Sequence, residues 1–228
     1  MDRPLRCALI GAEFEENLAL RSLAGSLAEA CIALLFGLLA VSCAAPEPPP
    51  APGAPAMQTL DSVLRARRSI RRFQPAPVPL EVLEPVLSAA ISGPSAGNRQ
   101  GFRIQVVRDA FIRNRLRDAA LGQASVGTAP VVLVFSADGP ASAAKYGDRG
   151  ADLYAVQDAT IACTIAWLKA VDSGLSGVWI GAFDERAVAE ILGLSAGVRP
   201  VALLPLGYAD ESPGSKTSRP RSELVSGE

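Results

Sequence analysis

The 228-residue chain contains no histidine. This absence excludes every Ser-His-Asp and Cys-His catalytic arrangement, every zinc site with a histidine ligand, and proton transfer by imidazole. Cysteine is also scarce, and three of the four cysteines precede the segment that we expect to fold. The fourth, Cys163, can by itself form neither an internal disulfide nor a cysteine-only zinc cluster. We therefore expect no metal site.

The chain also has no excess of charge of either sign, because 22 Lys and Arg side chains stand against 23 Asp and Glu, for a net charge of −1. Such a chain has no global positive field to attract nucleic acid or anionic lipid, and it carries no groove-reading motif, so we expect no nucleic-acid partner. The composition, 49% hydrophobic and 20% charged, is that of a folded globular protein. A site for an anionic ligand must then be local.

The N-terminal region carries a continuous apolar run at residues 30–41. This run has about half of the roughly 20 residues that a membrane-spanning helix needs. Small residues around Cys43 follow it, and this order resembles the signal sequence and acylation site of a bacterial lipoprotein. Residues 44–56 are rich in Pro and Ala, and this composition indicates an extended spacer.

We therefore expect three segments: a lipoprotein-type signal at 1–43 that ends at acylated Cys43, a linker at 44–56, and one folded domain at 57–228. The anchored domain would face the periplasm or the cell exterior. Four glutamates within the first 29 residues are unusual in an export signal. They leave a second interpretation open, in which the protein is cytoplasmic and starts at Met57.

Helices and strands are expected to interleave in the folded domain. The patterns predict a short helix from Leu60, helices at 80–91, 110–121, 151–171 and 185–192, and strands at 102–107, 131–135 and 201–206. The strand at 131–135 is continuously apolar, which indicates burial on both faces. Pro205 places the last strand at a sheet edge, or the proline late in that strand.

The helix at 151–171 is apolar on nearly all sides, so it must be covered all round. A domain of this size rarely covers such a helix alone, so we expect a homodimer. Together with the short strands, this long helix indicates an α+β fold.

Five arginines crowd into eight positions around Ser69: Arg65, Arg67, Arg68, Arg71 and Arg72. Guanidinium groups and a hydroxyl suit a phosphate, because bidentate donors match its oxygens. A solvated helix end is the alternative for such a cluster taken alone.

Two further segments have side chains or backbone suited to a flat ligand. The turn at 94–100 offers one hydroxyl and two amides, which can donate and accept as the edge of a flavin or a nucleobase requires. The segment at 177–183 places small residues after a bulky pair, so that backbone N–H groups can approach a ligand closely. Taken alone, the first is typical of a connecting turn and the second of a buried strand.

Four segments together resemble the nitroreductase family of FMN-dependent oxidoreductases: RRSIRRF at 67–73, GPSAGNRQGF at 93–102, GLSGVWIGAFDERAVAEILGL at 174–194, and RPVALLPLGYADE at 199–211. They occur in the family's order and approximate spacing, and the resemblance spans nearly all of the expected domain. It implies an α+β fold with a central, mostly antiparallel sheet flanked by helices. It also implies an intertwined homodimer with FMN at the interface.

The residues that the resemblance implies for FMN binding fall into four groups. The phosphate and ribityl end would be held by Arg67, Arg68, Ser69 and Arg71. The flavin would be lined, from the partner subunit, by Pro94, Ser95 and Asn98, with Gln100 nearby. The ring would face the backbone of Ile180, Gly181 and Ala182, with an N–H directed at flavin N5. A C-terminal arginine, Arg219 or Arg221, would close over the phosphate. No side chain is implied as a catalytic group, because the chemistry takes place on FMN.

The implied reaction is a ping-pong cycle. NAD(P)H delivers hydride to flavin N5, leaves, and is replaced by a small-molecule acceptor such as a nitroaromatic, a quinone or a free flavin. Export conflicts with this donor, because NAD(P)H is not expected outside the cytoplasmic membrane. A flavoenzyme with a non-nicotinamide donor and a tethered, non-catalytic flavin-binding module are therefore the alternatives. Gly101, where the family often has Pro followed by Trp, and Ala182, in place of a frequent glycine, indicate a substrate pocket of different shape.

Overall fold

The computed structural model describes residues 58–214 and 217–227. The expected signal at 1–43 with its Cys43 and the linker at 44–56 lie outside these described residues. Within them, no helix is both long and apolar enough to cross a bilayer.

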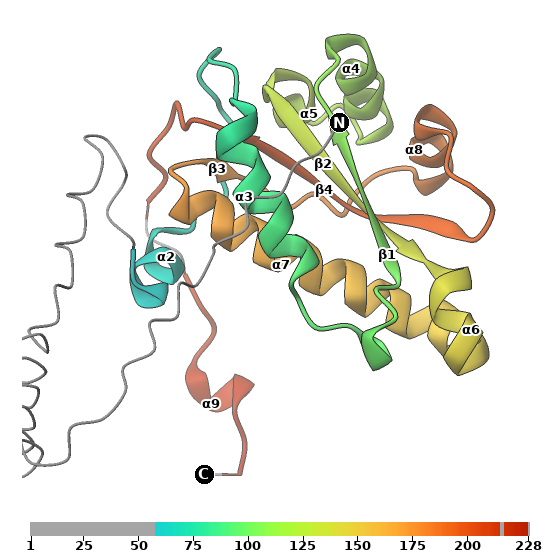
Figure 1. The fold of residues 1–228 in the computed structure, drawn as a ribbon. Coiled ribbons are helices and arrows are strands. Elements are labelled where there is room, and N and C mark those ends of the chain that lie inside the picture. Colours follow the sequence, from blue (N-terminus) through green and yellow to red (C-terminus); the bar gives the residue numbers. More distant parts are fainter. Residues whose placement is uncertain (1–57, 215–216, 228) are drawn as a thin grey trace, which may run out of the picture. The chain divides into compact units, whose positions relative to one another are not determined.

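Four strands form one antiparallel sheet in the order β1-β2-β4-β3 (Figure 1). Their bounds are β1 Phe102–Val107, β2 Val131–Asp138, β3 Ser176–Gly177 and β4 Val198–Gly207. Every residue of β2 is buried. Its side chains alternate between two hydrophobic clusters, with Leu133 and Phe135 in one and Val132 and Val134 in the other. This confirms the expected burial of the strand on both faces.

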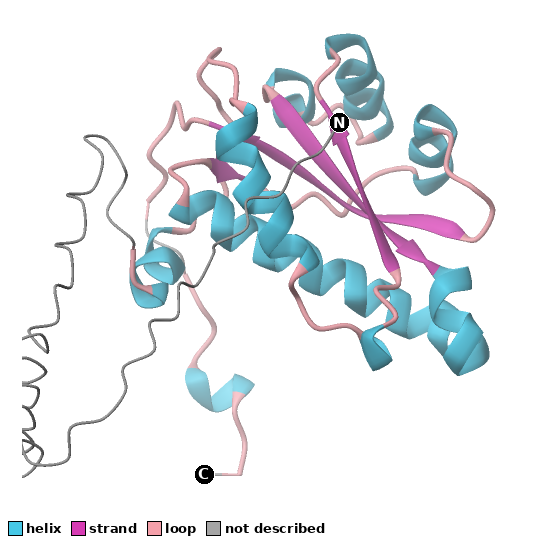
Figure 2. Cartoon of the chain, in the orientation of Figure 1, coloured by secondary structure: helices cyan, strands magenta, loops and turns pink. Residues whose placement is uncertain are grey.

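Helices cover both faces of this sheet (Figure 2). One face carries α3 (Leu80–Ile91) and α7 (Ala155–Asp172), which also pack on each other. The other carries α4 (Ala110–Ala119), α5 (Ala124–Thr128) and α8 (Glu185–Leu192). The domain is therefore the expected α+β arrangement, with a central antiparallel sheet between two helical layers.

The helix predicted at 151–171 begins later in the structure, at Ala155. A π-helical turn, Gly150–Tyr154, and the helix α6, Gly139–Arg149, precede it, and the sequence patterns did not indicate α6. The α6 helix starts where the Asp138 side chain accepts the N–H of Ala141 at 3.2 Å. The sequence of α6 is rich in small and polar residues, so it lacks the apolar period that marks a helix.

Prolines of the domain lie inside a helix and inside a strand. Pro85 lies inside α3, after its first turn. The last strand, β4, is not at an edge, since it lies between β2 and β3, but Pro205 does come late in it, opposite Val132. Pro200 stands opposite Ser136, where the register shifts by a β-bulge. A proline next to a bulge removes a ladder donor where the ladder is already interrupted.

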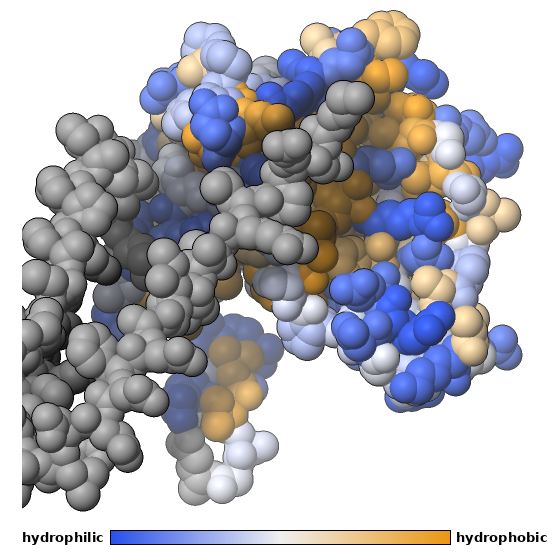
Figure 3. All heavy atoms as spheres, viewed as in Figure 1, coloured by the Kyte–Doolittle hydropathy of each residue, from blue (hydrophilic) through white to orange (hydrophobic). Residues whose placement is uncertain are grey.

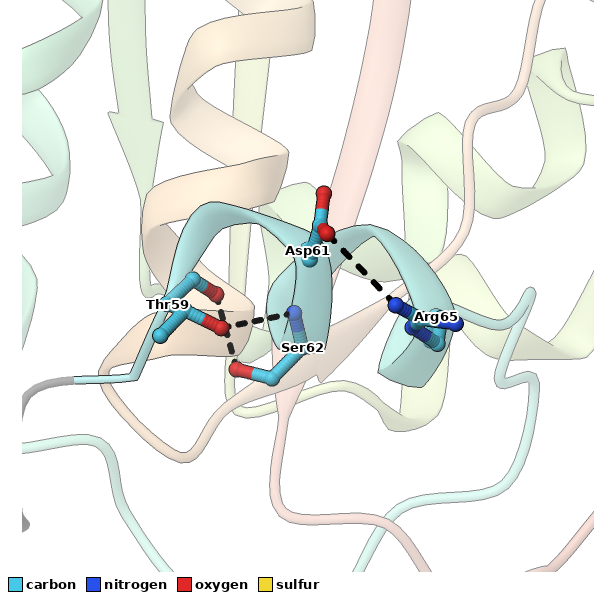
Figure 4. A network of polar contacts seen from close by, with 4 residues as sticks. All are labelled: Thr59, Asp61, Ser62 and Arg65. Carbon is cyan, nitrogen blue, oxygen red and sulfur yellow. Dashed lines mark hydrogen bonds and ion pairs between the residues drawn. The ribbon is translucent and has the colours of Figure 1, made fainter.

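Side-chain caps start two of the helices. The N-terminus of α8 is capped by Asp184, which accepts the N–H of Ala187 at 3.0 Å, and Gly193 ends the helix in a left-handed conformation. The helix α2, Leu60–Ala66, starts with the Thr59 side chain accepting the N–H of Ser62 at 3.2 Å (Figure 4).

Candidate functional site

The arginine cluster, defined as Arg65, Arg67, Arg68, Arg71 and Arg72, connects α2 to one end of the sheet. Directly after α2, Ser69 forms a parallel bridge with Gly177 of β3, and the N–H of Ile70 donates to the Gly177 carbonyl at 3.0 Å. Further on, Phe73 forms an antiparallel bridge with Ala209. The structure thus brings together two segments that the sequence singled out, 67–73 and 177–183.

Two arginines of the cluster have no acidic partner among residues 58–214 and 217–227. The Arg67 guanidinium lies over the ring of Trp167 in α7, 4.5 Å from its centroid. The Arg68 Nη1 donates to the carbonyls of Arg65 and Arg67, at the C-terminal end of α2. The hydroxyl of Ser69 has no hydrogen-bond partner in the same part of the chain. The Arg67 guanidinium and the Ser69 hydroxyl remain available to an anion, and their chemistry suits a phosphate, whereas the Nη1 of Arg68 is engaged within the chain.

The other three arginines of the cluster interact with carboxylates, Arg65 and Arg72 through their side chains and Arg71 through its backbone N–H. Arg65 pairs with Asp61 at 3.5 Å on the exposed side of α2 (Figure 4). The Glu211 carboxylate accepts the backbone N–H of Arg71 at 2.5 Å and that of Arg72 at 3.3 Å, and it pairs with the Arg72 side chain at 3.5 Å. These donors, the N–H of Arg71 first, lower the pKa of Glu211 below its ordinary value. Glu211 therefore fastens the arginine cluster to the segment after β4.

A cavity of about 360 Å³ opens beside this junction. Its lining includes Arg68 and Ser176 together with Glu211 and Ser212. With Arg65 as well, two guanidiniums, two hydroxyls and one carboxylate give the cavity a polar character, in keeping with a site for a charged or hydroxylated group.

The segment 177–182 contains one closely packed glycine, Gly177, and one exposed glycine, Gly181. A Cβ at Gly177 would lie 2.6 Å from the Pro205 carbonyl oxygen, so only glycine lets β3 approach β4. Next, Ile180 exchanges two backbone hydrogen bonds with Leu203, each of 2.9 Å. Gly181 and Ala182 are exposed, and their N–H groups donate to no other described residue. These two N–H groups are thus free for a ligand, and the flavin contact that the resemblance implies for this segment stays a prediction.

The loop at 94–101 is held by a buried carboxylate of α7. Asp158 is 2% exposed; its Oδ1 accepts the N–H of Ala96 at 3.0 Å and its Oδ2 accepts the N–H of Gly101 at 3.1 Å. A Cβ at Gly101 would lie 2.1 Å from the Ser142 Oγ, so a side chain at this position would displace a buried group. The departure of this chain from the family pattern at Gly101 therefore has a packing reason.

The backbone of this loop is unusual. Its short 3-10 turn, Ala96–Asn98, includes Gly97 at φ 54°, and both Asn98 (φ 54°) and Gln100 (φ 50°) are left-handed without being glycine. Such residues are uncommon and are held in place by their surroundings. The Ser95 hydroxyl accepts the N–H of Gln100 at 2.9 Å, so part of its capacity is used within the loop. The Asn98 and Gln100 side chains are exposed.

A second cavity, of about 500 Å³, borders the loop. Pro94, Ser95 and Ala96 line one side, and Tyr154 and Gln157 line the other. Of the four loop residues that the resemblance assigns to the flavin, Pro94 and Ser95 border this cavity, whereas Asn98 and Gln100 are not in its lining.

The two candidate half-sites, the loop 94–101 and the arginine cluster, contact α7 at points separated by about half of its length. Asp158, which holds the loop, and Trp167, which stacks on Arg67, are nine positions apart in this helix. That spacing is about 14 Å along the axis and about two and a half turns, which puts the two residues on opposite faces. One chain therefore does not place its loop 94–101 and its arginine cluster around the same small ligand.

The C-terminal arginines lie at the short helix α9, Arg221–Leu224. Arg219 pairs with Glu223 at 2.9 Å. Arg221 is the first residue of that helix and is exposed. Their assignment to a ligand phosphate stays a prediction.

Four residues at these half-sites were not singled out as site residues from the sequence: Trp167, Asp158, Glu211 and Gln123. The Gln123 side chain donates to the Ala182 carbonyl at 3.0 Å and so reaches the exposed segment from α5. Asp158 carried a usable signal, because it is a lone carboxylate inside an otherwise apolar helix and must find donors when buried. No group of three potential His, Cys, Asp or Glu ligands for a metal occurs among the described residues.

The sequence and the structure were compared with known proteins. A sequence model of the nitroreductase family matches residues 64–128 and 122–208. A NADH dehydrogenase of Thermus thermophilus is 38% identical over 172 residues, which cover 64% of this chain and 84% of that protein. A NADPH-flavin oxidoreductase of Vibrio harveyi is 32% identical over 174 residues, which cover 73% of this chain and 72% of that protein.

The structural comparison agrees. A solved structure of the NADPH:FMN oxidoreductase from Vibrio harveyi, complexed with NAD+, superposes with a TM-score of 0.68 at 30% sequence identity. The superposition covers 74% of this chain and 76% of that one. The similarity thus includes both the sheet and the helices that carry the two half-sites.

Proposed function

The chain belongs to the nitroreductase family, and from that premise we propose that it is an FMN-dependent oxidoreductase that uses NAD(P)H to reduce a small-molecule acceptor. The observation that carries the proposal is a set of unengaged donors at one end of the sheet. The Arg67 guanidinium and the Ser69 hydroxyl lie beside the strand that leads to the free N–H groups of Gly181 and Ala182. Arg68 lies next to them, but its Nη1 already donates to two backbone carbonyls. The names of the relatives, a NADPH-flavin oxidoreductase and a NADPH:FMN oxidoreductase, support the same cofactors.

The donor set fits FMN in kind. Guanidinium groups and a hydroxyl suit the phosphate, and backbone N–H groups suit the acceptor atoms of a flat ring. When bound, FMN supplies the redox chemistry, taking hydride from NAD(P)H at N5 and passing it to an acceptor such as a nitroaromatic, a quinone or a flavin. The N–H of Gly181 or Ala182 would donate near N5, and the positive charges of the arginine cluster would favour the electron-rich reduced cofactor.

We propose that the site is completed by a second copy of the chain. Because the loop 94–101 and the arginine cluster lie on opposite faces of α7, a partner's loop would meet the arginine cluster of the first copy. Exposed apolar side chains on α2 and α3 support such an interface; they are Leu60, Leu64, Leu80 and Ile91. A largely apolar cavity of about 420 Å³ between α2, α3 and α7 adds to this surface, and Figure 3 shows further hydrophobic side chains in the middle of one face.

The location of the protein is a separate proposal that rests on the sequence before Met57. We propose that Cys43 is acylated and that the domain faces the periplasm or the cell exterior. Membrane fractionation of the chain and of its Cys43→Ala variant tests this. Recovery of the wild-type chain, like the Cys43→Ala variant, in the soluble fraction would favour a cytoplasmic protein that starts at Met57.

The visible absorption spectrum of the purified full chain, before and after anaerobic NADH addition, tests the proposed activity. A flavin band that NADH bleaches is the expected result. A flavin band that stays after both NADH and NADPH addition would support FMN as the cofactor and refute NAD(P)H as the electron donor. It would favour an exported flavoenzyme with another donor, or a flavin-binding module without this activity. Absence of a flavin band after FMN addition would refute the proposal.

A charge reversal tests the binding assignment. Arg67→Glu places a carboxylate among the phosphate donors, and we expect it to abolish FMN retention. The matched control is Arg115→Glu on the exposed face of α4, which should retain FMN. Full occupancy in the Arg67→Glu protein would contradict the assignment.

A further inference from the structure

Trp167 in α7 is unusual because its indole N–H is buried without an acceptor among the described residues. It is half-buried on α7 and packs against the hydrophobic cluster of α3, α7 and the sheet. A buried indole N–H normally finds an acceptor, so this unpaired donor indicates that the ring is placed here for another contact.

That contact is with Arg67. The guanidinium carbon lies 4.5 Å from the centroid of the Trp167 ring, well within the range of a cation–π interaction. Arg67 itself is half-buried and has no acidic partner in the described part of the chain. Trp167 is thus the group that fixes this guanidinium, and no carboxylate neutralises it.

Stacking fixes a guanidinium in a particular way. A guanidinium held over an aromatic ring makes this contact without using its N–H donors, which can then bind an anion. This arrangement presents a preset fork of donors to an anion, whereas an ion pair would occupy those same donors. The cost of ordering a long side chain when the ligand binds is then already met in the free protein.

We propose that Trp167 is a positioning residue for Arg67 and thereby gives the chain its preference for a phosphate-bearing flavin over an unphosphorylated one. The inference rests on the proposed function, because it takes FMN as the ligand of the arginine cluster. It adds a residue that acts on the cofactor only through Arg67.

The test compares two ligands that differ by the phosphate. The full chain, freed of flavin, is titrated with FMN and with riboflavin, and the ratio of the two dissociation constants measures the contribution of the phosphate. Trp167→Leu should lower the preference for FMN about three- to tenfold. Trp167→Phe keeps an aromatic face, so its ratio should stay within about twofold of the wild-type value. Affinity for riboflavin should change little in either variant.

Two controls distinguish a specific effect of Trp167 on Arg67 from a general loss of packing in the domain. Phe111→Leu removes the ring beneath another arginine, Arg115, at 5.9 Å on α4, and it should leave the ratio unchanged. In an Arg67→Gln background, Trp167→Leu should have no further effect on the ratio, because the group it positions is absent. Trp167→Met, which fills space with a flexible side chain, replaces the leucine variant if that variant does not fold.

The outcomes distinguish this inference from the function on which it rests. A wild-type chain that binds neither flavin refutes both. A wild-type chain that prefers FMN, with Trp167→Leu weakening FMN and riboflavin by the same factor, refutes the inference alone. An undiminished effect of Trp167→Leu in the Arg67→Gln background refutes it as well.

Discussion

The Oδ2 of Asp158 accepts the backbone N–H of Gly101 at 3.1 Å, across 57 residues of sequence. The second oxygen of the same buried carboxylate accepts the N–H of Ala96. A buried carboxylate is tolerated when backbone donors satisfy it, and here those donors come from a loop with left-handed residues. Asp158 therefore determines the conformation of the loop 94–101, although it is far from that loop in the sequence.

Replacement of this carboxylate should loosen the loop. We expect Asp158→Asn to lower the free energy of unfolding by about 1.5–3 kcal/mol, because an amide group faces one N–H donor with its own N–H. Urea denaturation measures the change. The control is Asp152→Asn, an exposed acid of the turn before α7, whose effect should stay within about 0.5 kcal/mol. Equal stability of the Asp158→Asn protein and the wild type would contradict the role given to Asp158.

The two glycines of the segment 177–182 should respond differently to the same substitution. In Gly177→Ala the new Cβ meets the Pro205 carbonyl oxygen at 2.6 Å, so we expect a loss of about 1–3 kcal/mol in the free energy of unfolding. In Gly181→Ala the nearest atom is the Trp179 Nε1 at 3.4 Å, and stability should change by less than about 0.5 kcal/mol. Thermal denaturation of both variants decides the matter, and a larger loss at Gly181 would overturn the packing argument.

The Glu211 carboxylate gives the arginine cluster a dependence on pH. Its ordinary pKa is 4.5, and the N–H groups of Arg71 and Arg72 lower the pKa in the folded state. Glu211 therefore contributes stability above pH 4.5, and this contribution is lost as the pH falls through the lower, folded-state pKa. We expect Glu211→Gln to be less stable than the wild type at neutral pH and to lose less stability between about pH 5 and pH 3.

Denaturation at several pH values, in the wild type and in Glu211→Gln, measures this dependence. Glu84→Gln, at an exposed position of α3, is the control and should follow the wild-type curve. An identical acid dependence in the wild type and the Glu211→Gln protein would show that the carboxylate does not fasten the arginine cluster.

The thiol of Cys163 should be unreactive in the folded protein. Burial raises its pKa well above the ordinary value, and the thiolate is the form that reacts with alkylating agents. At pH 8 we expect iodoacetamide to spare Cys163 in the native chain and to modify it in denaturant. Peptide mapping by mass spectrometry is the required readout, because the sequence has three other cysteines. Modification of the native protein would mean that α7 opens readily.

Local sequence patterns predicted the elements that have a strong period or a strong cap. The strand at 131–135 and the helix between Asp184 and Gly193 are examples, since a continuous apolar run and a capping pair are each visible in a few adjacent residues. The helix α6 was missed because its residues have no apolar period. The short strand β3 was missed because its pairing with Gly207 and Leu206 depends on a distant segment.

The candidate site was predictable to the extent that its groups lie in the chain as clusters. The arginine cluster and the exposed Gly181 and Ala182 could be recognised in this way. The contacts of Trp167 with Arg67 and of Asp158 with Gly101 could not, because each joins residues at least 57 positions apart through the fold. Sequence spacing within a short motif contains no information about such pairs.

The position of the two half-sites on opposite faces of α7 has a genetic consequence. With each site shared between two copies of the chain, as proposed, a mixed dimer can combine an Arg67→Glu chain with a chain defective in the loop 94–101. One of its two sites would then contain both defects, and the other would contain neither. Two alleles that are each inactive alone would therefore restore up to half of the sites of every mixed dimer when expressed in the same cell.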